Sequence, residues 1–428
     1  MSLIVKIGKQ GKKLLRKLLP APMPQLSAVR RIEQIKTDRR IVAMTFDDGP
    51  SAVPCSPDLF DGKPLTEVIL DTLAEFHAHG TFDVIGDTSE NYPDKEGSVG
   101  TADWSGIRYD HYPAFGRDAL GGAGANPELI GRMLREGHQI TNHGYRHVLF
   151  GKKPFVYGKR STFHTLSQVT DDLKRLHSLM QNSYGYTVTM ARPPHYVDRI
   201  GDGFTSYDAY ALMNYQYLAA SYDGAGWLPV SAETPEASYA AEVDAMVRPM
   251  ETLLAQDPDA LCGQIIFQKD GCNMAKRTPV ATGLRKQLEL LSKYGYQVVT
   301  VNELLAVSPF ADVGADDPDF EKLCRLCENR IITYSDNRLR LDQRMTKGEL
   351  ALLLAPKDIA LKLRREIILR TGKTVPTAAG AFIWCAEQGY FHADDRMTDA
   401  VASLPGDAFT ETADFTRRSV YRAYREDA

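Results

Sequence analysis

The sequence predicts an α/β fold whose core is a parallel sheet, open or closed into a barrel, followed by a smaller, mainly helical domain. From residue 40 onward, short apolar runs alternate with longer segments of helical periodicity, which is typical of parallel α/β folds. With 428 residues, 43% of them hydrophobic and 25% charged, the chain is long enough for a large core and a second module. A charge-rich segment after Ser308 predicts the boundary between them.

The predicted strands and helices alternate along this core. The first strand, IVAMTF, is an almost unbroken apolar run, as in strands that are buried on both faces. Glycine ends several helical patterns, and a strand follows directly. The predicted strands are 41–46, 81–86, the end of 126–143, a stretch near 187–194, 218–223 and 265–268. The predicted helices are 64–80, the start of 126–143, and stretches near 166–182 and 236–255, while 278–305 is predicted as helix, strand and helix.

Two longer segments interrupt this alternation after strands, where α/β folds place functional loops. Residues 87–125 are rich in glycine and carry Trp104, Tyr109, His111 and Tyr112. Residues 148–165 combine aromatic with basic side chains: Phe150, Phe155, Tyr157, Lys152, Lys153, Lys159 and Arg160. Aromatic rings and cations suit sugar binding, so both segments are predicted either to contact a substrate or to be loops without a function.

The charge of the chain is uneven along its length. Residues 1–31 contain eight basic side chains and no acidic one, so the rest of the chain carries −12 when the total is −4. An acidic main body argues against nucleic acid as its partner. No apolar run reaches the roughly 18–20 residues that span a bilayer. The N-terminus also lacks the uninterrupted apolar region of a signal peptide.

The N-terminal segment has the pattern of a cationic amphipathic helix. On a helical projection one face is apolar and the opposite face carries lysine and arginine; the apolar residues are Ile4, Ile7, Leu14, Leu15 and Leu18. Two interpretations stay open. Residues 3–19 either make a peripheral contact with an anionic membrane, or form a frayed leader, since Gly8 and Gly11 each weaken a helix by roughly 1 kcal/mol.

The six cysteines do not define the redox compartment. Cys324 and Cys327 form a C-x2-C without a matching pair, and their spacing fits one face of a helix. They are therefore predicted to be core side chains rather than zinc ligands. Cys262 and Cys272 are predicted to be either buried thiols or a disulfide.

Two adjacent carboxylates follow the first predicted strand. In TFDDGP, Asp47 and Asp48 directly precede a turn, and at a strand end both can reach one pocket. Because two carboxylates in one pocket repel each other, a cation is their natural partner. In NHGYRH, His143 and His147 are spaced i, i+4, and one helical turn would bring both imidazoles to one side. Together these residues predict a two-histidine, one-carboxylate metal site that leaves positions for water.

An arginine is predicted to complete this site. In ARPPHY two prolines follow Arg192 and make the segment extended and rigid. Arg192 is therefore held in place, where it can orient an aspartate and keep it ionised. Taken alone, the same pattern would also fit a surface arginine beside a turn.

These motifs, in this order and at these separations, resemble the NodB-type polysaccharide deacetylases, which form carbohydrate esterase family 4. The resemblance rests on TFDDG, H-x3-H, RPP, D-x3-W and a strand ending in aspartate, and on GHQITNHGYRH and YGYQVVTVNELL, over roughly 41–305. It implies a distorted (β/α) barrel and metal-dependent removal of acetyl groups from sugars. The implied cofactor is a divalent metal ion, Zn²⁺ in the first place and Co²⁺ as the alternative.

The resemblance also implies a role for each matching residue near the metal. Asp48, His143 and His147 would bind the ion. Asp47 would be the base that activates the water held there, and Arg192 would orient Asp47.

Four further residues are implied to act on the substrate. The backbone N–H of His195, which stands where the family has tyrosine, would help to stabilise the oxyanion. Trp227 and Phe267 would form apolar walls around the acetyl methyl group, and Asp223 would also lie in the substrate site.

The chain departs from the family at two further positions. The motif D-x-x-D-W reads DGAGW here, so Gly226 replaces the aspartate beside the tryptophan. The family's fifth motif ends in His-Asp, and here it ends in Lys269-Asp270. In the family that histidine is the general acid and the lost aspartate tunes it, so both members of one pair are missing.

The loss of a general acid typically lowers a rate by ~10²–10⁴-fold. A lysine, with an ordinary pKa of ~10.4, is a weak acid at neutral pH unless burial and a nearby metal lower that value. Lys269 is hypothesised to replace the histidine as proton donor or as a cation that stabilises the transition state. An ester leaving group depends less on this proton, so O-acetyl substrates become more favoured relative to N-acetyl amides than in the histidine-bearing members of the family.

The C-terminal region carries a second, fainter resemblance. Residues 332–354, preceded by PFADV, resemble one S-layer-homology unit, with its signature represented by Thr346, Lys347, Gly348 and Glu349. Residues 381–400 are a candidate second copy. Such modules bind cell-wall polysaccharide; the alternative is an unrelated helical bundle.

The predicted domains are a basic leader over 1–39, a deacetylase domain over 40–307 and a C-terminal module over 308–428. The predicted substrate is an N-acetylglucosamine-type glycan or an O-acetylated polysaccharide. Two alternatives stay open: a non-catalytic glycan-binding protein on the same fold, and a C–N hydrolase of a small cyclic amide. The resemblance implies a bacterial cell envelope or an extracellular location, whereas the missing signal peptide leaves a cytoplasmic or membrane-peripheral one open.

Overall fold

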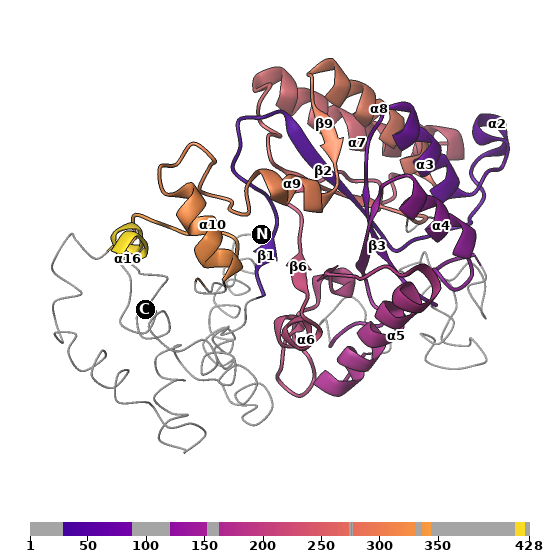
Figure 1. Cartoon of the computed structure of the whole chain (residues 1–428). Coiled ribbons are helices and arrows are strands. Elements are labelled where there is room, and N and C mark those ends of the chain that lie inside the picture. The colour runs from indigo at the N-terminus through magenta and orange to yellow at the C-terminus, as the bar shows by residue number, and fades with distance from the viewer. Residues whose placement is uncertain are drawn as a thin grey trace, which may run out of the picture. The chain divides into compact units, whose positions relative to one another are not determined.

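A computed structural model describes the sheet, its helices and a few C-terminal segments. The described residues are 29–87, 120–151, 162–273, 275, 277–329, 332, 336–343 and 416–423. The chain divides into two compact units, and the sheet belongs to the unit formed by 28–325 and 334–340 (Figure 1). The other unit consists of 1–27, 326–333 and 341–428. None of the described helices is both long and apolar enough to cross a membrane.

The strands form one parallel sheet that curls into a distorted barrel. Its order is β1-β6-β5-β4-β3-β2-β8-β7, with β9 also paired to β2. The strands are β1 (Arg31–Ile32), β2 (Ile41–Asp47), β3 (Thr81–Val84), β4 (Gln139–Asn142), β5 (Met190–Ala191), β6 (Gln216–Leu218), β7 (Tyr222–Asp223), β8 (Ile265–Lys269) and β9 (Gln297–Val299). Only 219–221 separate β6, which pairs with β5, from β7, which pairs with β8. The sheet therefore continues from β2 through β8 to the edge strand β7, and the strands form a curled half-barrel, which confirms the predicted α/β fold.

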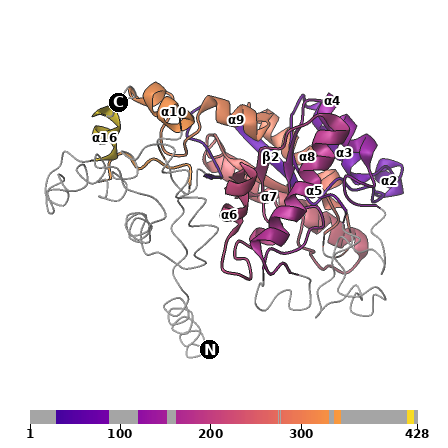
Figure 2. The ribbon, with the colours of Figure 1, turned by 60° about the horizontal axis from the view of Figure 1, so that its bottom comes forward.

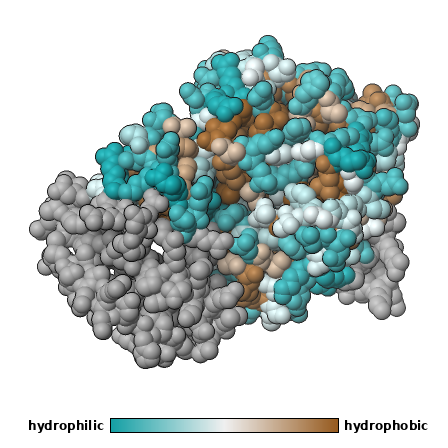
Figure 3. All heavy atoms as spheres, viewed as in Figure 1, coloured by the Kyte–Doolittle hydropathy of each residue, from teal (hydrophilic) through white to brown (hydrophobic). Residues whose placement is uncertain are grey.

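Helices cover the outside of this barrel (Figures 1 and 2). The helices of the sheet unit are α2 (Pro57–Phe60), α3 (Leu65–Glu75), α4 (Pro127–Arg135), α5 (Leu166–Tyr184), α6 (Ser206–Met213), α7 (Pro235–Gln256), α8 (Pro279–Lys293) and α9 (Val301–Val307). Helix α10 (Phe320–Glu328) begins in this unit and ends in the other, and α16 (Arg417–Ala423) belongs to the other unit. Helices α7, α8, α3 and α4 pack side by side in that order. On the face drawn in Figure 3, hydrophilic side chains form most of the described surface and hydrophobic ones show between them. This distribution is expected for helices whose apolar side faces the sheet.

The predicted strands and helices of the core are confirmed within a few residues, except that the predicted strand 218–223 is wrong, because β6 ends at Leu218 and β7 begins at Tyr222. Several short elements were not predicted. Strand β1 has two residues and lies within the segment predicted as a basic leader, yet Ile32 is fully buried in the sheet unit. Helix α6 was not predicted. It begins where Asp208 accepts a hydrogen bond from the N–H of Thr205, which is a helix-capping pattern visible in the sequence. The amphipathic segment 3–19, most of the two aromatic insertions and the S-layer-like signature lie outside the described residues. Cys262 and Cys272 form no disulfide, and Cys324 and Cys327 of α10 are half-buried rather than core side chains.

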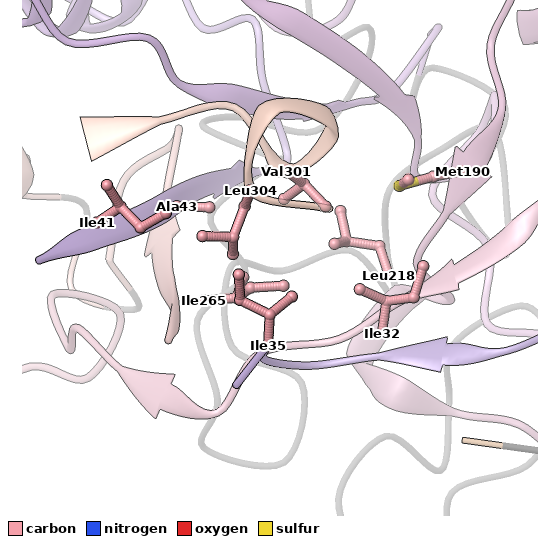
Figure 4. Packing of buried hydrophobic residues seen from close by; sticks show 9 residues of the cluster. All are labelled: Ile32, Ile35, Ile41, Ala43, Met190, Leu218, Ile265, Val301 and Leu304. Carbon is pink, nitrogen blue, oxygen red and sulfur yellow. The ribbon is translucent and has the colours of Figure 1, made fainter. Parts of the chain in front are cut away.

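One end of the barrel is closed by an apolar cluster (Figure 4). Ile41 and Ile265 begin β2 and β8, and Val301 and Leu304 of α9 pack against them. The remaining members are Ile32, Ile35, Ala43, Met190 and Leu218. Because all strands are parallel, this cluster lies at their amino ends, and the opposite end is left for polar side chains.

A buried histidine makes the stability of this fold depend on pH. His138 precedes β4, and its Nδ1 accepts a hydrogen bond from the N–H of Gly80 at 3.0 Å. The side chain is 1% exposed, and burial lowers the pKa of His138 to about 4. The ring is therefore neutral in the folded protein at neutral pH, with its proton on Nε2.

Acidification from pH 7 to pH 4 is expected to destabilise the protein through His138. The unfolded chain binds a proton near pH 6.5 and the folded chain only near pH 4, so this contribution is complete above about pH 6.5 and is lost as the pH falls. The loss amounts to roughly 2–3 kcal/mol of unfolding free energy. The measurement is urea unfolding at several pH values. Between pH 7 and pH 4, His138→Asn, whose side-chain carbonyl can still accept a hydrogen bond from Gly80, should lose roughly 2–3 kcal/mol less unfolding free energy than the wild type. His77→Asn, at an exposed histidine, should follow the wild type, and equal pH slopes for all three proteins would contradict this assignment.

Candidate metal centre

The chemistry-bearing residues lie at the carboxyl ends of the strands. Asp47 and Lys269 are the last residues of β2 and β8, and Asp48 follows β2. His143 follows β4, and Arg192 follows β5. Since parallel strands all end at the same edge, residues from four distant parts of the sequence meet in one place.

Asp48, His143 and His147 surround one point in space. The Asp48 Oδ1 lies 3.1 Å from His143 Nε2 and 3.0 Å from His147 Nε2. All three residues are buried, and their ligand atoms lie within 4.8 Å of one another. Two imidazoles and one carboxylate aimed at the same place form a donor set that suits a divalent metal ion. The described part of the chain thus holds an Asp/His metal-binding group.

The two histidines reach this point by a loop, so the expected helical turn is wrong. Residues 143–147 have no helical hydrogen bonds; Gly144 has φ 84° and His147 has φ 53°. Asp172 of α5 holds the loop, since its carboxylate accepts the N–H of Tyr145 at 2.8 Å and the Nε–H of Arg146 at 2.8 Å. Glycine at 144 permits the left-handed backbone that turns the chain. Asp172 was missed because a lone aspartate in a helix gives no distinguishing pattern.

Asp47 is held by Arg192. The guanidinium is fully buried, and its Nη1 donates to Asp47 Oδ1. Arg192 also donates to Thr45 Oγ1 at 3.1 Å and to the carbonyl of Ala219 at 3.1 Å, which fixes its position. Burial raises the pKa of Asp47 to about 7, although Arg192 acts in the opposite direction. For His143, burial lowers the pKa, but the carboxylates around the ring outweigh it and raise that pKa well above its usual value.

Asp83 is a site residue that the sequence reasoning missed. It lies on β3, directly opposite Asp47 in register, and is fully buried. Its Oδ2 is 2.7 Å from His143 Nδ1. A charged residue inside the apolar strand TFDVIG was the available signal.

Lys269 faces the metal-binding group rather than solvent. Its Nζ lies 2.5 Å from Asp48 Oδ2, and the residue is 9% exposed. The next residue, Asp270, is fully buried, accepts a hydrogen bond from Thr66 Oγ1 and packs against Gly49. A Cβ at Gly49 would lie 1.9 Å from Asp270 Oδ2. The residue that follows Asp48 must therefore be a glycine as long as Asp270 keeps this position.

Two of the expected substrate residues lie near the group and two pair with each other. The ring of His195 is 5.3 Å from that of His147, and the ring of Phe267 is 5.8 Å from the Arg192 guanidinium carbon. The indole N–H of Trp227 donates to Asp223 at 3.2 Å. That hydrogen bond is with an exposed carboxylate of β7, not with a carboxylate of the metal group.

The backbone explains the glycine that replaces the family's aspartate. Gly226 has φ 86°, and a Cβ there would lie 3.0 Å from Val280 and 3.1 Å from the sulfur of Met246. A side chain at this position is therefore opposed by both the backbone and the packing.

Restoring a side chain at this position is expected to destabilise the protein. Gly226→Ala should cost about 2–3 kcal/mol, because a left-handed residue costs roughly 1–2 kcal/mol and close packing adds to it. The control is Gly185→Ala, at another glycine of positive φ where an added Cβ would meet nothing within 4 Å. It should lose only the roughly 1–2 kcal/mol of unfolding free energy that the left-handed backbone costs. Urea unfolding of both variants measures the difference. Equal losses would show that Val280 and Met246 do not restrict this site.

Comparisons with known proteins agree on one family. The profile of the family described as polysaccharide deacetylase matches residues 34–197. The peptidoglycan-N-acetylmuramic acid deacetylase PdaC of Bacillus subtilis is 24% identical over 174 residues, which are 41% of this chain and 25% of that protein. A peptidoglycan-N-acetylglucosamine deacetylase of Bacillus cereus is 24% identical over 275 residues, 64% of this chain and 91% of that protein. A chitooligosaccharide deacetylase of Sinorhizobium fredii is 29% identical over 125 residues, 29% of this chain and 37% of that protein.

The chain spans a quarter of the length of PdaC and 42% of that of a peptidoglycan deacetylase from Listeria monocytogenes. The match to the family profile covers β2 to β5 and the segment after β5, with Asp47, Asp48, His143, His147 and Arg192. These residues are also the ones that the structure brings together at the strand ends. Residues 34–197 are therefore similar to the polysaccharide deacetylase family, and this part of the chain carries the metal-binding group and Arg192.

Proposed function

We propose that this protein is a metal-dependent hydrolase that removes acetyl groups from a carbohydrate polymer or oligomer. The observation that carries the proposal is the arrangement of Asp47 beside the metal-binding group. Its Oδ1 is bound by Arg192, and its Oδ2 lies 3.9 Å from His143 Nε2, so the second oxygen faces the ligands. A site that only bound a glycan would need neither this base nor the buried arginine.

Asp48, His143 and His147 would hold the metal, and their donor set fits Zn²⁺ or Co²⁺. Bound there, such an ion supplies Lewis-acid polarisation of the acetyl carbonyl and makes water a stronger acid. Asp47 takes the proton from the attacking water at Oδ2, because Arg192 occupies Oδ1. The backbone N–H of His195 stabilises the oxyanion, and Phe267 forms an apolar wall for the methyl group. Trp227 and Asp223 extend the substrate site.

The proposed substrate is an acetylated glycan of the bacterial cell envelope. Relatives that match this chain are named as deacetylases of peptidoglycan and of chitooligosaccharides. The general-acid position of the family is held here by Lys269, which contacts Asp48. An amide needs its leaving nitrogen protonated more than an ester needs its oxygen, so we propose that O-acetyl groups are hydrolysed relatively better here than by histidine-bearing relatives.

Acetate release is the direct test of this function. The purified full chain, stripped with a chelator, is incubated with acetylated chitooligosaccharide, peptidoglycan or acetylxylan, with and without added Zn²⁺ or Co²⁺. Release that requires the metal supports the proposal. Stoichiometric metal binding without release from any substrate would contradict it.

A second candidate is a non-catalytic glycan-binding protein on the same fold. One observation favours it: an ammonium group already lies against Asp48, where it neutralises a carboxylate of the metal group. Binding of the three glycans without acetate release would identify this alternative. The third possibility, hydrolysis of a small cyclic amide, is not favoured by the family match.

A further inference from the structure

We propose that Asp83 is a positioning residue for the metal site. Held by Thr141, it keeps the proton of His143 on Nδ1 and so presents the Nε2 lone pair to the metal. The inference rests on the proposed metal-dependent function for its significance, but its test measures metal binding and not acetate release.

Strand pairing places Asp83 inside the barrel wall. It is opposite Asp47 on β2 and opposite Thr141 on β4, so it lies between the base and the strand that leads to His143. The residue is fully buried. A buried carboxylate costs several kcal/mol unless it is paired or hydrogen-bonded, so its place in an otherwise apolar strand calls for a specific partner.

The two oxygens of Asp83 have different surroundings. Oδ1 accepts a hydrogen bond from Thr141 Oγ1 at 2.5 Å. Oδ2 lies 2.7 Å from His143 Nδ1, and no donor among the described residues is aimed at it. The Nδ1–H of His143 instead points to the carbonyl of Arg192 at 2.9 Å. A small rotation of the ring would direct the same N–H to Asp83.

This environment decides where the imidazole carries its proton. Nδ1 faces two acceptors, the Asp83 carboxylate and the Arg192 carbonyl, and neither can donate to it. The proton of a neutral ring therefore belongs on Nδ1. Nε2, which is 3.1 Å from Asp48 Oδ1, is then the nitrogen with the free lone pair. Carboxylates that hold a metal-binding histidine in this way typically change metal affinity by ~10–100-fold when removed.

Metal titration of two Asp83 variants tests this assignment. Asp83→Asn keeps the shape and removes the charge, and Asp83→Val removes the acceptor. Zn²⁺ affinity is measured by competition with a chromophoric chelator, in the full chain and without substrate. Both variants are expected to bind Zn²⁺ about 10–100-fold more weakly than the wild type, with the larger loss for Asp83→Val.

Nitrogen-15 NMR of the histidine rings shows which ring nitrogen carries the proton and which binds the metal, and general destabilisation of the protein would not change this assignment. In zinc-loaded wild type, His143 should show a protonated Nδ1 and a metal-bound Nε2, and this measurement does not require a variant to fold. Metal bound through Nδ1 of His143 would overturn the proposal. In Asp83→Val the Nδ1–H signal should shift, because only the Arg192 carbonyl remains.

Asp172→Asn is the matched control. Asp172 is a carboxylate of similar burial that contacts the backbone and arginine of the histidine loop and not an imidazole ring. This variant should lower stability and leave the Nδ1–H signal of His143 in place. Wild-type zinc affinity in both Asp83 variants, or the same change of the His143 signal in Asp172→Asn, would show that Asp83 has no positioning role.

Discussion

An Asp47→Asn variant is expected to release acetate ~10²–10⁴-fold more slowly than the wild type while binding the metal as tightly. The amide can keep a hydrogen-bonding contact with Arg192 but cannot accept the proton of the attacking water. Asp47 also lies close to Asp83 and His143, but it is not one of Asp48, His143 and His147, which we propose as the metal ligands. Loss of its charge is therefore expected to change the base more than the ligand set. Steady-state acetate release and a zinc titration of the same preparation measure the two quantities separately.

His147→Gln provides the contrasting variant. Its imidazole Nε2 lies 3.0 Å from Asp48 Oδ1, about as close as that of His143, and it is one of the three proposed ligands. Both metal binding and acetate release should therefore be lost together. If Asp47→Asn instead lost the metal, or kept its full rate, Asp47 would not be the base of this site.

The motifs at the strand ends were predictable because topology decides where they meet. TFDD, NHGYRH and RPP each follow an apolar strand, and parallel strands bring such ends to one edge. The alternation of strand and helix was sufficient to assign Asp48, His143 and Arg192 to one end of the barrel. The path of the chain between the two histidines was not predictable from their spacing, since i, i+4 fits a helix and the loop depends on Gly144 and a distant carboxylate, Asp172.

Asp83 and Asp172 were not predicted from the sequence for the same physical reason. Asp83 and Asp172 act through partners that are far away in sequence, His143 and its loop, and neither stands in a motif. Their roles depend on strand register and on the packing of α5, which a single sequence does not contain. Gly226 shows the same limit in reverse. The sequence shows a glycine in place of the aspartate, and the structure adds that φ 86° and close packing oppose a side chain at this position.

Lys269 is expected to have two opposite effects: it competes with a metal ion for Asp48, and it assists the chemical step. Zinc affinity and acetate release of one variant measure these effects separately. The ammonium group of Lys269 lies 2.5 Å from Asp48 Oδ2, so it stabilises that carboxylate without a metal and competes with a cation for it. It also ends β8 opposite Asp47, and we have proposed that it takes the place of the general acid. A cation at this place can donate a proton to the leaving group or stabilise the charge that develops on the substrate.

Lys269→Met is therefore expected to bind Zn²⁺ more tightly and to turn over more slowly. Removing a positive charge from Asp48 should raise zinc affinity by about tenfold or more, because the interaction lies in a buried, low-dielectric pocket. Loss of the acid or cation should reduce acetate release by ~10²–10⁴-fold for N-acetyl substrates and less for O-acetyl esters, whose leaving group needs the proton less. Zinc titration and acetate release on both substrate types measure these changes, and Lys293→Met, at an exposed lysine of α8, should leave both unchanged. Unchanged acetate release from every substrate in Lys269→Met would show that the lysine only occupies the position of the lost acid, and weaker zinc binding would show that it supports the metal instead of competing with it.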